Sequence, residues 1–200
     1  MNLPNRLTLL RVIIVPFFLA CLTLPFGIDI SVAGRISLRI GALFFFTAAM
    51  LTDIIDGKIA RKYNMVTDFG KFMDPLADKI MVSAAFISYV SYNAISVWVV
   101  VIILTREFFV SGIRIMGAVH NKVIPAGILG KHKTAWQIIL IYALIVEELC
   151  NLIFPHTLLW IHISILIIKY TLISGTMFFT VYSAYRYFAE NIDIFREGAL

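Results

Sequence analysis

The feature that most constrains the fold is a series of long apolar segments, several of them near the length of about 20 residues that spans a bilayer as a helix. Hydrophobic residues make up 60% of the 200 positions and charged residues 14%. Ordinary soluble domains are about 45–50% apolar and about 25% charged, so this composition excludes a soluble globular domain. We expect an all-α, polytopic integral membrane protein, because the excess of apolar residues is arranged in long runs.

The apolar segments predict six transmembrane helices in a single domain that covers residues 1–200. Their expected ranges are about 8–27, 38–61, 72–90, 97–118, 135–149 and 157–188. Lys and Arg gather on one side of these helices, and such segments are cytoplasmic. We therefore expect a multi-pass protein of the inner (cytoplasmic) membrane, with both termini and the acidic segment described below facing the cytoplasm. The cations counted on that side are Arg6, Arg11, Lys58, Arg61, Lys62, Lys71, Lys122, Lys131, Lys133, Arg186 and Arg196.

The net charge of +5 is too small and too dispersed to indicate nucleic-acid binding, and it fits contact with anionic membrane lipids. Cys21 and Cys150 both lie in apolar surroundings. We expect small buried side chains there, and neither a disulfide nor a thiolate metal site.

Four carboxylates follow one another closely in an otherwise apolar stretch of the chain. Asp53 and Asp56 are three positions apart, and Asp74 and Asp78 are four apart, so each pair would lie on one face of a helix. If two helix ends meet there, the four acids converge, and their repulsion favours proton uptake unless a cation holds them. Oxygen ligands with no nearby Cys or His suit Mg²⁺ or Mn²⁺.

The alternative is that these acids are solvated residues of a loop between membrane helices. Asp53 and Asp56 nevertheless continue the apolar run of residues 42–51 without a turn signal. Carboxylates that face a membrane interior are costly and usually functional, so we favour the metal site.

A second group of charges interrupts a later apolar segment at Arg106, Glu107 and Arg114. One interpretation is an internal ion pair with a further Arg whose stem lies in lipid and whose head reaches water. The other is an anion site that Lys131 and Lys133 join from the next helix. We favour the anion site, which could hold a phosphate beside a metal-bound pyrophosphate.

The acidic segment has the form D-x-x-D-G-x-x-A-R-(x)₈-G-x-x-x-D-x-x-x-D, from Asp53 to Asp78. It resembles the CDP-alcohol phosphotransferase (phosphatidyltransferase) family of integral membrane enzymes, and every fixed position matches. The flanking patterns P-N-x-x-T-x-x-R at 4–11, T-R-E at 105–107 and G-K-x-K-T at 130–134 are similar to its bacterial phosphatidylglycerophosphate synthases. The resemblance covers all six expected helices.

The resemblance implies transfer of a phosphatidyl group from CDP-diacylglycerol to sn-glycerol 3-phosphate, with release of CMP, by a homodimer with that family's fold. It implies two divalent ions, Mg²⁺ or Mn²⁺, on Asp53, Asp56, Asp74 and Asp78, with Asp78 as general base for the acceptor hydroxyl. The implied CDP-binding positions are Asn5, Thr8, Gly57, Ala60, Arg61 and Gly70. The implied acceptor-phosphate positions are Arg106, Arg114, Lys131, Lys133 and Thr134.

Other functions remain open at this point. The acidic motif is shared by enzymes that use phosphatidylglycerol, an inositol phosphate or serine as acceptor, so only the flanking cations favour glycerol 3-phosphate. A cation transporter would place its acids near the bilayer midplane, often in two related halves, and no internal repeat is visible here. A non-catalytic assembly protein gives no reason for four acids at these spacings. The role of Lys169 is not assigned.

Overall fold

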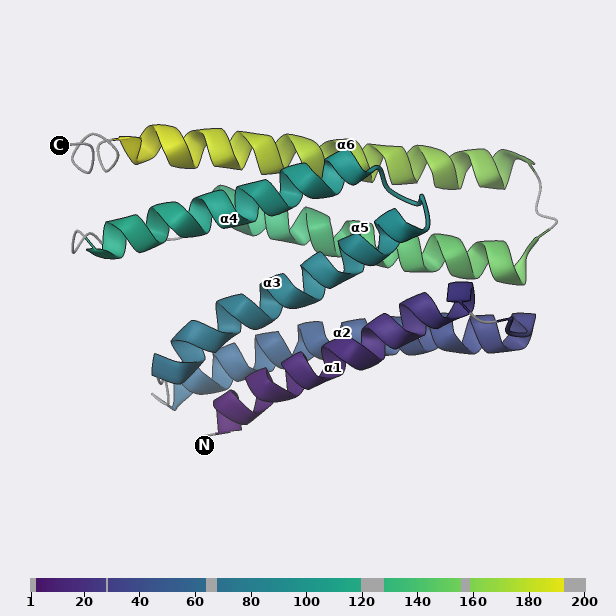
Figure 1. Ribbon diagram of the computed structural model, residues 1–200, viewed down its shortest axis with the longest axis horizontal. Helices are drawn as coiled ribbons and strands as arrows, with labels where there is room; N and C mark the ends of the chain where they lie inside the picture. Colours follow the sequence, from purple (N-terminus) through teal and green to yellow (C-terminus); the bar gives the residue numbers. More distant parts are fainter. Residues whose placement is uncertain (1–2, 28, 64–67, 120–127, 156–158, 193–200) are drawn as a thin grey trace. The chain divides into compact units, whose positions relative to one another are not determined.

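The computed structural model describes residues 3–27, 29–63, 68–119, 128–155 and 159–192 (Figure 1). Within these ranges the chain forms helices and no strand, which confirms the all-α prediction. The helices are α1 (Leu3–Gly27), α2 (Val32–Lys62), α3 (Asp68–Ser91), α4 (Val97–Val119), α5 (Ile128–Ile153) and α6 (Leu159–Glu190).

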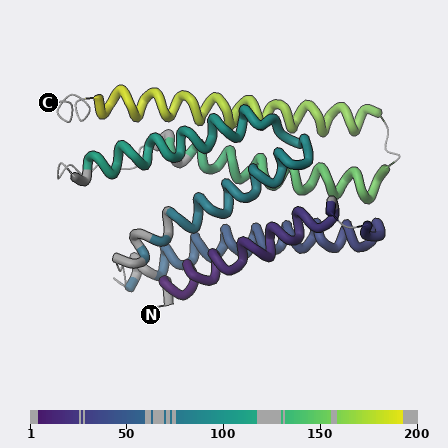
Figure 2. The backbone as a smooth tube through the Cα atoms, viewed as in Figure 1, coloured from purple at the N-terminus to yellow at the C-terminus, as the bar shows by residue number. Residues whose placement is uncertain are grey.

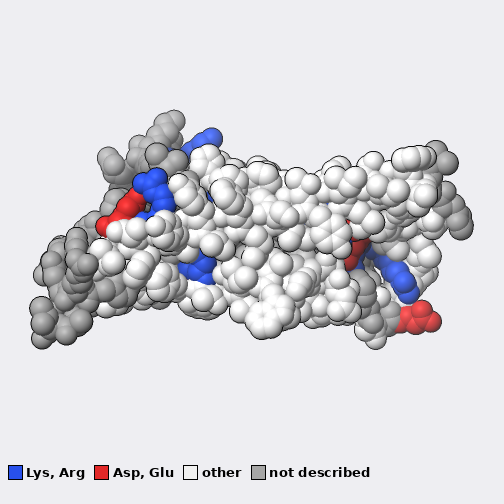
Figure 3. Space-filling view, turned by 90° about the horizontal axis from the view of Figure 1, so that it is seen from above, with Lys and Arg blue, Asp and Glu red and all other residues white. Residues whose placement is uncertain are grey.

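Four of these helices, α1, α2, α5 and α6, are long and apolar enough to cross a membrane. The other two carry too many charges: every 18-residue stretch of α4 contains Arg106, Glu107 and Arg114. Every such stretch of α3 contains Asp74, Asp78 and Lys79. On the face shown in Figure 3 charged side chains form only a few small groups, as expected of a membrane-embedded protein. The prediction of six spans is thus supported for four helices.

The chain divides into two compact units, which we describe separately. The first comprises Met1–Tyr92 and Ile141–Leu158, and in it α1 packs along both α2 and α3. The second comprises Asn93–Leu140 and Leu159–Leu200, and in it α4 packs along α6. Figure 2 traces the backbone through these helices. Helix α5 contributes its C-terminal part to the first unit and its N-terminal part to the second.

The core of the first unit is built from aromatic rings beside small residues. The rings of Phe18 and Phe46 lie 5.6 Å apart, and Tyr142 of α5 meets Phe46 edge-on at 5.0 Å. Ala42 and Ala49 on α2 are fully buried. Small residues let helix backbones approach closely, which is the main way membrane helices gain packing energy.

A buried arginine completes the end of α1. Pro25 has no amide hydrogen, so the carbonyl of Cys21 lacks its helical donor four residues on. Nη1 of Arg39 donates to that carbonyl at 3.2 Å and to the carbonyl of Leu22 at 2.7 Å. Nε of Arg39 lies 2.6 Å from Oε2 of Glu148 on α5. Arg39 thus pairs its charge with Glu148 and gives Nη1 to two carbonyls within one unit.

The predicted starts are too late for four helices: α3 begins at Asp68 and α5 at Ile128, where we expected about 72 and 135, and the first two helices also begin earlier than predicted. Helix α1 begins at Leu3, and α2 begins at Val32, inside a segment that we expected to be a loop up to residue 37. The cause at α2 is Ser31, whose hydroxyl accepts a hydrogen bond from the amide of Gly34 and caps the helix.

We predict that Arg39→Gln destabilises the protein by about 3–5 kcal/mol, because it leaves a carboxylate and two carbonyls without their partner. Thermal unfolding of the purified protein in detergent measures the effect as a lower Tm. The matched control is Arg35→Gln on the same helix, since Arg35 is partly exposed and lies 4.0 Å from Asp29. Equal Tm values for the two variants would contradict this account of the buried pair.

Candidate active site

A polar stripe runs along the buried face of α1. Asn5, Thr8 and Arg11 are three positions apart, close to one helical turn, and all three are buried. Their neighbours Leu9 and Leu10 are exposed. Polar residues inside and leucines outside are the pattern of a helix that faces lipid on one side and a polar site on the other.

Arg11 meets three of the four predicted aspartates. Its Nη1 lies 2.9 Å from Oδ1 of Asp53 and 2.7 Å from Oδ1 of Asp78, and its Nη2 lies 2.7 Å from Oδ2 of Asp56. Helix α2 supplies Asp53 and Asp56, and α3 supplies Asp78. The structure therefore gathers acids from two helices around one guanidinium group on a third.

Burial differs among these three acids. The Asp56 side chain is 4% exposed, whereas Asp53 is 40% and Asp78 45% exposed. The Arg11 side chain is completely buried. The carboxylate of Asp56 is thus shielded from solvent, whereas those of Asp53 and Asp78 are accessible to solutes.

From the sequence we count Arg11 only as a cytoplasmic cation and do not predict its partners. Arg11 lies within α1 and its charge is directed toward α2 and α3. Its place near the N-terminus gave no sign of these partners, because Asp56 and Asp78 lie 45 and 67 positions further along the chain.

The other predicted positions of this site are described in part. Gly57 of α2 is half-buried and Gly70 of α3 is buried. Helical backbone passes through positions 60, 61 and 74, but the side chains predicted there lie outside the described residues; they are Ala60, Arg61 and Asp74.

The donor chemistry of the three acids fits a divalent ion such as Mg²⁺ or Mn²⁺. These hard cations prefer carboxylate oxygens, and the three acids already converge on a positive group. Each of these acids has an oxygen within 2.9 Å of a terminal nitrogen of Arg11, and no group of three Asp, Glu, His or Cys side chains in the described part of the chain is arranged to bind a metal ion. The same oxygens are therefore engaged by an internal cation.

The second unit brings together Arg106 and Lys133, two residues of the predicted anion site. Nη1 of Arg106 lies 3.2 Å from Oε1 of Glu107, and Nζ of Lys133 contacts the same oxygen. Nε of Arg106 donates to the hydroxyl of Ser183 on α6 at 3.2 Å. Arg106 and Lys133 thus lie together, with one carboxylate between two cations. The internal ion pair that the sequence left open is present.

Arg114 has a different partner. Its Nε donates to the hydroxyl of Tyr187 at 3.1 Å, and its guanidinium carbon lies 5.7 Å from the centre of that ring. Thr134 is exposed, and its hydroxyl donates to the carbonyl of Gly130 in its own helix. The side chain of Lys131 is outside the described residues.

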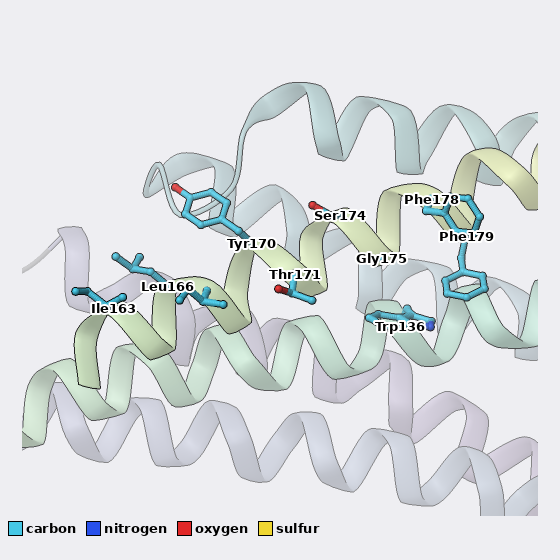
Figure 4. Close-up of a pocket in the computed structure, with 10 residues that line it drawn as sticks. Trp136, Ile163, Leu166, Tyr170, Thr171, Ser174, Gly175, Phe178 and Phe179 are labelled. Atoms are coloured by element: carbon cyan, nitrogen blue, oxygen red, sulfur yellow. The ribbon is translucent and has the colours of Figure 1, made fainter. Parts of the chain in front are cut away.

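A groove of about 770 Å³ lies between α5 and α6 in the second unit (Figure 4). Trp136 lies against Gly175, where a Cβ atom would come within 2.5 Å of the indole, and it stacks on Phe179 at 5.4 Å. None of the described residues that line this groove is charged, so their side chains do not suit it to a phosphate. Its lining residues are Trp136, Ile163, Leu166, Ile167, Tyr170, Thr171, Ser174, Gly175, Phe178 and Phe179.

Sequence reasoning missed three residues of these clusters: Arg11, Ser183 and Tyr187. Arg11 continues the spacing of Asn5 and Thr8, which was the signal for it. On α6, buried polar residues recur at intervals of three or four and mark one face of the helix. They are Thr176, Thr180, Ser183 and Tyr187.

Comparison with known proteins decides the family. The family model described as CDP-alcohol phosphatidyltransferase matches residues 1–184. The chain belongs to this family. The resemblance found from the sequence motif is confirmed, and members of the CDP-alcohol phosphatidyltransferase family generally depend on divalent metal ions.

Relatives in this family include a CDP-diacylglycerol–glycerol-3-phosphate 3-phosphatidyltransferase of Bacillus subtilis, 39% identical over 198 residues, or 95% of each chain. A protein of the same name from Rickettsia felis is 40% identical over 72% of this chain and 75% of its own. A probable phosphatidylglycerophosphate synthase of Mycobacterium tuberculosis is 41% identical over 70% of this chain and 64% of its own.

Proposed function

We propose that the chain transfers the phosphatidyl group of CDP-diacylglycerol to sn-glycerol 3-phosphate, with phosphatidylglycerophosphate and CMP as products. The observation that carries the proposal is the convergence of Asp53, Asp56 and Asp78 of the family motif on one positive group. Two relatives at 39% and 40% identity bear the name of this reaction, and one of them aligns with 95% of the chain.

We assign the donor substrate to the first unit. Asp53, Asp56, Asp74 and Asp78 hold two divalent ions, Mg²⁺ or Mn²⁺. Bound there, the ions supply charge stabilisation for the pyrophosphate and for CMP as it leaves. Small residues on α2 let a nucleotide approach the helix backbone closely. The CDP-binding residues that we propose are Asn5, Thr8, Gly57, Ala60, Arg61 and Gly70.

Asp78 is the general base in this proposal. A base must reach the acceptor hydroxyl directly, which the 4% exposure of Asp56 excludes; Asp53 and Asp78 are both accessible, at 40% and 45%, and the family resemblance favours Asp78. A carboxylate is too weak a base to deprotonate an alcohol in advance. Asp78 therefore accepts the hydroxyl proton while the new phosphorus–oxygen bond forms and CMP leaves.

We assign the phosphate of the acceptor to the second unit. Arg106 and Lys133 both contact the carboxylate of Glu107, which leaves an excess of positive charge among the described side chains of this cluster. A phosphate dianion is attracted by such an excess, whereas serine has no comparable need of it. The acceptor-phosphate residues that we propose are Arg106, Arg114, Lys131, Lys133 and Thr134.

The proposal places this enzyme in the inner membrane as a single domain, residues 1–200, with its active site toward the cytoplasm. The distribution of Lys and Arg supports that orientation even without Arg11 in the count. We also propose a homodimer, which rests on the family resemblance alone.

We predict that Asp78→Asn abolishes CMP release, because the amide cannot take the hydroxyl proton. The Kd for CDP-diacylglycerol in the presence of Mg²⁺ should change much less than turnover. The control is Asp29→Asn, which removes an exposed carboxylate from the same unit. Full activity of Asp78→Asn would rule out the base assignment.

We predict that Lys133→Ala raises the KM for glycerol 3-phosphate roughly tenfold or more, since a charge-assisted hydrogen bond contributes about 1.5–3 kcal/mol. The KM for CDP-diacylglycerol should stay nearly constant. Arg186→Ala is the control, because Arg186 is an exposed cation of the same unit paired with Glu190. An equal rise of both KM values would remove the acceptor-site assignment.

A further inference from the structure

We propose that Arg11 is a built-in counter-ion that holds the catalytic carboxylates together until a divalent ion enters, and that metal binding displaces it. This inference rests on the proposed function for the presence of a metal. It does not depend on which acceptor the enzyme uses.

The charge balance of the cluster requires a counter-ion. Three carboxylates from two helices face one guanidinium, so acids outnumber cations among the described side chains in contact with Arg11. Without Arg11, the repulsion among these partly buried acids would separate α2 from α3 or cause proton uptake. An arginine suits the task because its planar fork directs separate N–H donors at separate carboxylates, which a lysine ammonium does less rigidly.

The contacts of Arg11 differ from those of a permanent structural arginine. Its Nε is buried and has no hydrogen-bond partner among the described residues. A buried donor without a partner has a free-energy cost. Arg39, the other buried arginine of this unit, has its Nε 2.6 Å from Glu148 and its Nη1 on two carbonyls. Arg11 is held by the carboxylates alone, through its two terminal nitrogens.

A divalent ion and Arg11 compete for the same oxygens. Each of the three carboxylates has an oxygen within 2.9 Å of a terminal nitrogen of Arg11. A metal ion must replace such hydrogen bonds with direct oxygen ligation, and it adds two positive charges beside the guanidinium. The metal-free protein therefore keeps its helices assembled, but metal binding has to overcome the pairing with Arg11. Removing Arg11 should weaken the metal-free state and strengthen metal binding.

The test uses the purified full-length protein in detergent without any substrate. The Kd for Mn²⁺ is measured from the electron paramagnetic resonance signal of the free ion, and Tm is measured in chelator and in saturating Mn²⁺. We expect Arg11→Gln to bind Mn²⁺ roughly tenfold more tightly than the unsubstituted protein, a difference of about 1.4 kcal/mol. Its Tm should fall in chelator and recover in Mn²⁺.

Two further variants make the result specific. Arg39→Gln removes a buried arginine from the same unit and should lower Tm equally with and without Mn²⁺, with an unchanged Kd. Arg11→Lys keeps one positive charge and should bind Mn²⁺ with an intermediate Kd, which decides the question if Arg11→Gln does not fold.

An unchanged or weaker affinity in Arg11→Gln, or in Arg11→Lys if only that variant folds, would overturn this proposal and leave the proposed function intact. Absence of Mn²⁺ binding by both the unsubstituted protein and the Arg11 variants would overturn this proposal together with the metal assignment. Failure of glycerol 3-phosphate as acceptor affects neither measurement, since no substrate is present.

Discussion

The pairing of Arg11 with Asp53, Asp56 and Asp78 is the interaction on which the first unit depends. Lipid gives apolar helix surfaces little reason to associate, so close packing and polar contacts decide which membrane helices adjoin. This cluster joins α1, α2 and α3 through residues 45 and 67 positions apart. Carboxylates without a positive partner are costly among membrane helices, and Arg11 supplies that partner from α1 to acids on α2 and α3.

The second unit also has a cluster of charged side chains among its helices, but there cations outnumber acids among the described residues. Glu107 lies between Arg106 and Lys133, as Arg11 lies among three acids. Among the described residues, the first cluster has an excess of acids, three around one arginine, and the second has an excess of cations, two around one acid. The first excess suits divalent ions and the second suits a phosphate, which are the charges that a metal-assisted transfer to glycerol 3-phosphate has to bind.

The sequence predicted the six helices and the convergence of Asp53, Asp56 and Asp78, because apolar runs and the spacing of carboxylates are local patterns. It did not reveal the partners of Arg11 and Arg39, since nothing near either residue identifies an acid in another helix. Ser31 was missed as a cap, so α2 was predicted to begin too late. Hydropathy supports four spans because the charges of α3 and α4 are those of the candidate sites. Charged residues of the proposed sites thus lower the hydropathy of the helices that carry them.

The most direct test of the central claim is CMP release from CDP-diacylglycerol by the purified protein, with Mg²⁺ and one acceptor at a time. The acceptors are glycerol 3-phosphate, phosphatidylglycerol, serine and an inositol phosphate, and each reaction is repeated with a chelator. We predict release with glycerol 3-phosphate alone, and none once the metal is removed. Release that persists in chelator, or that requires another acceptor, would contradict the account.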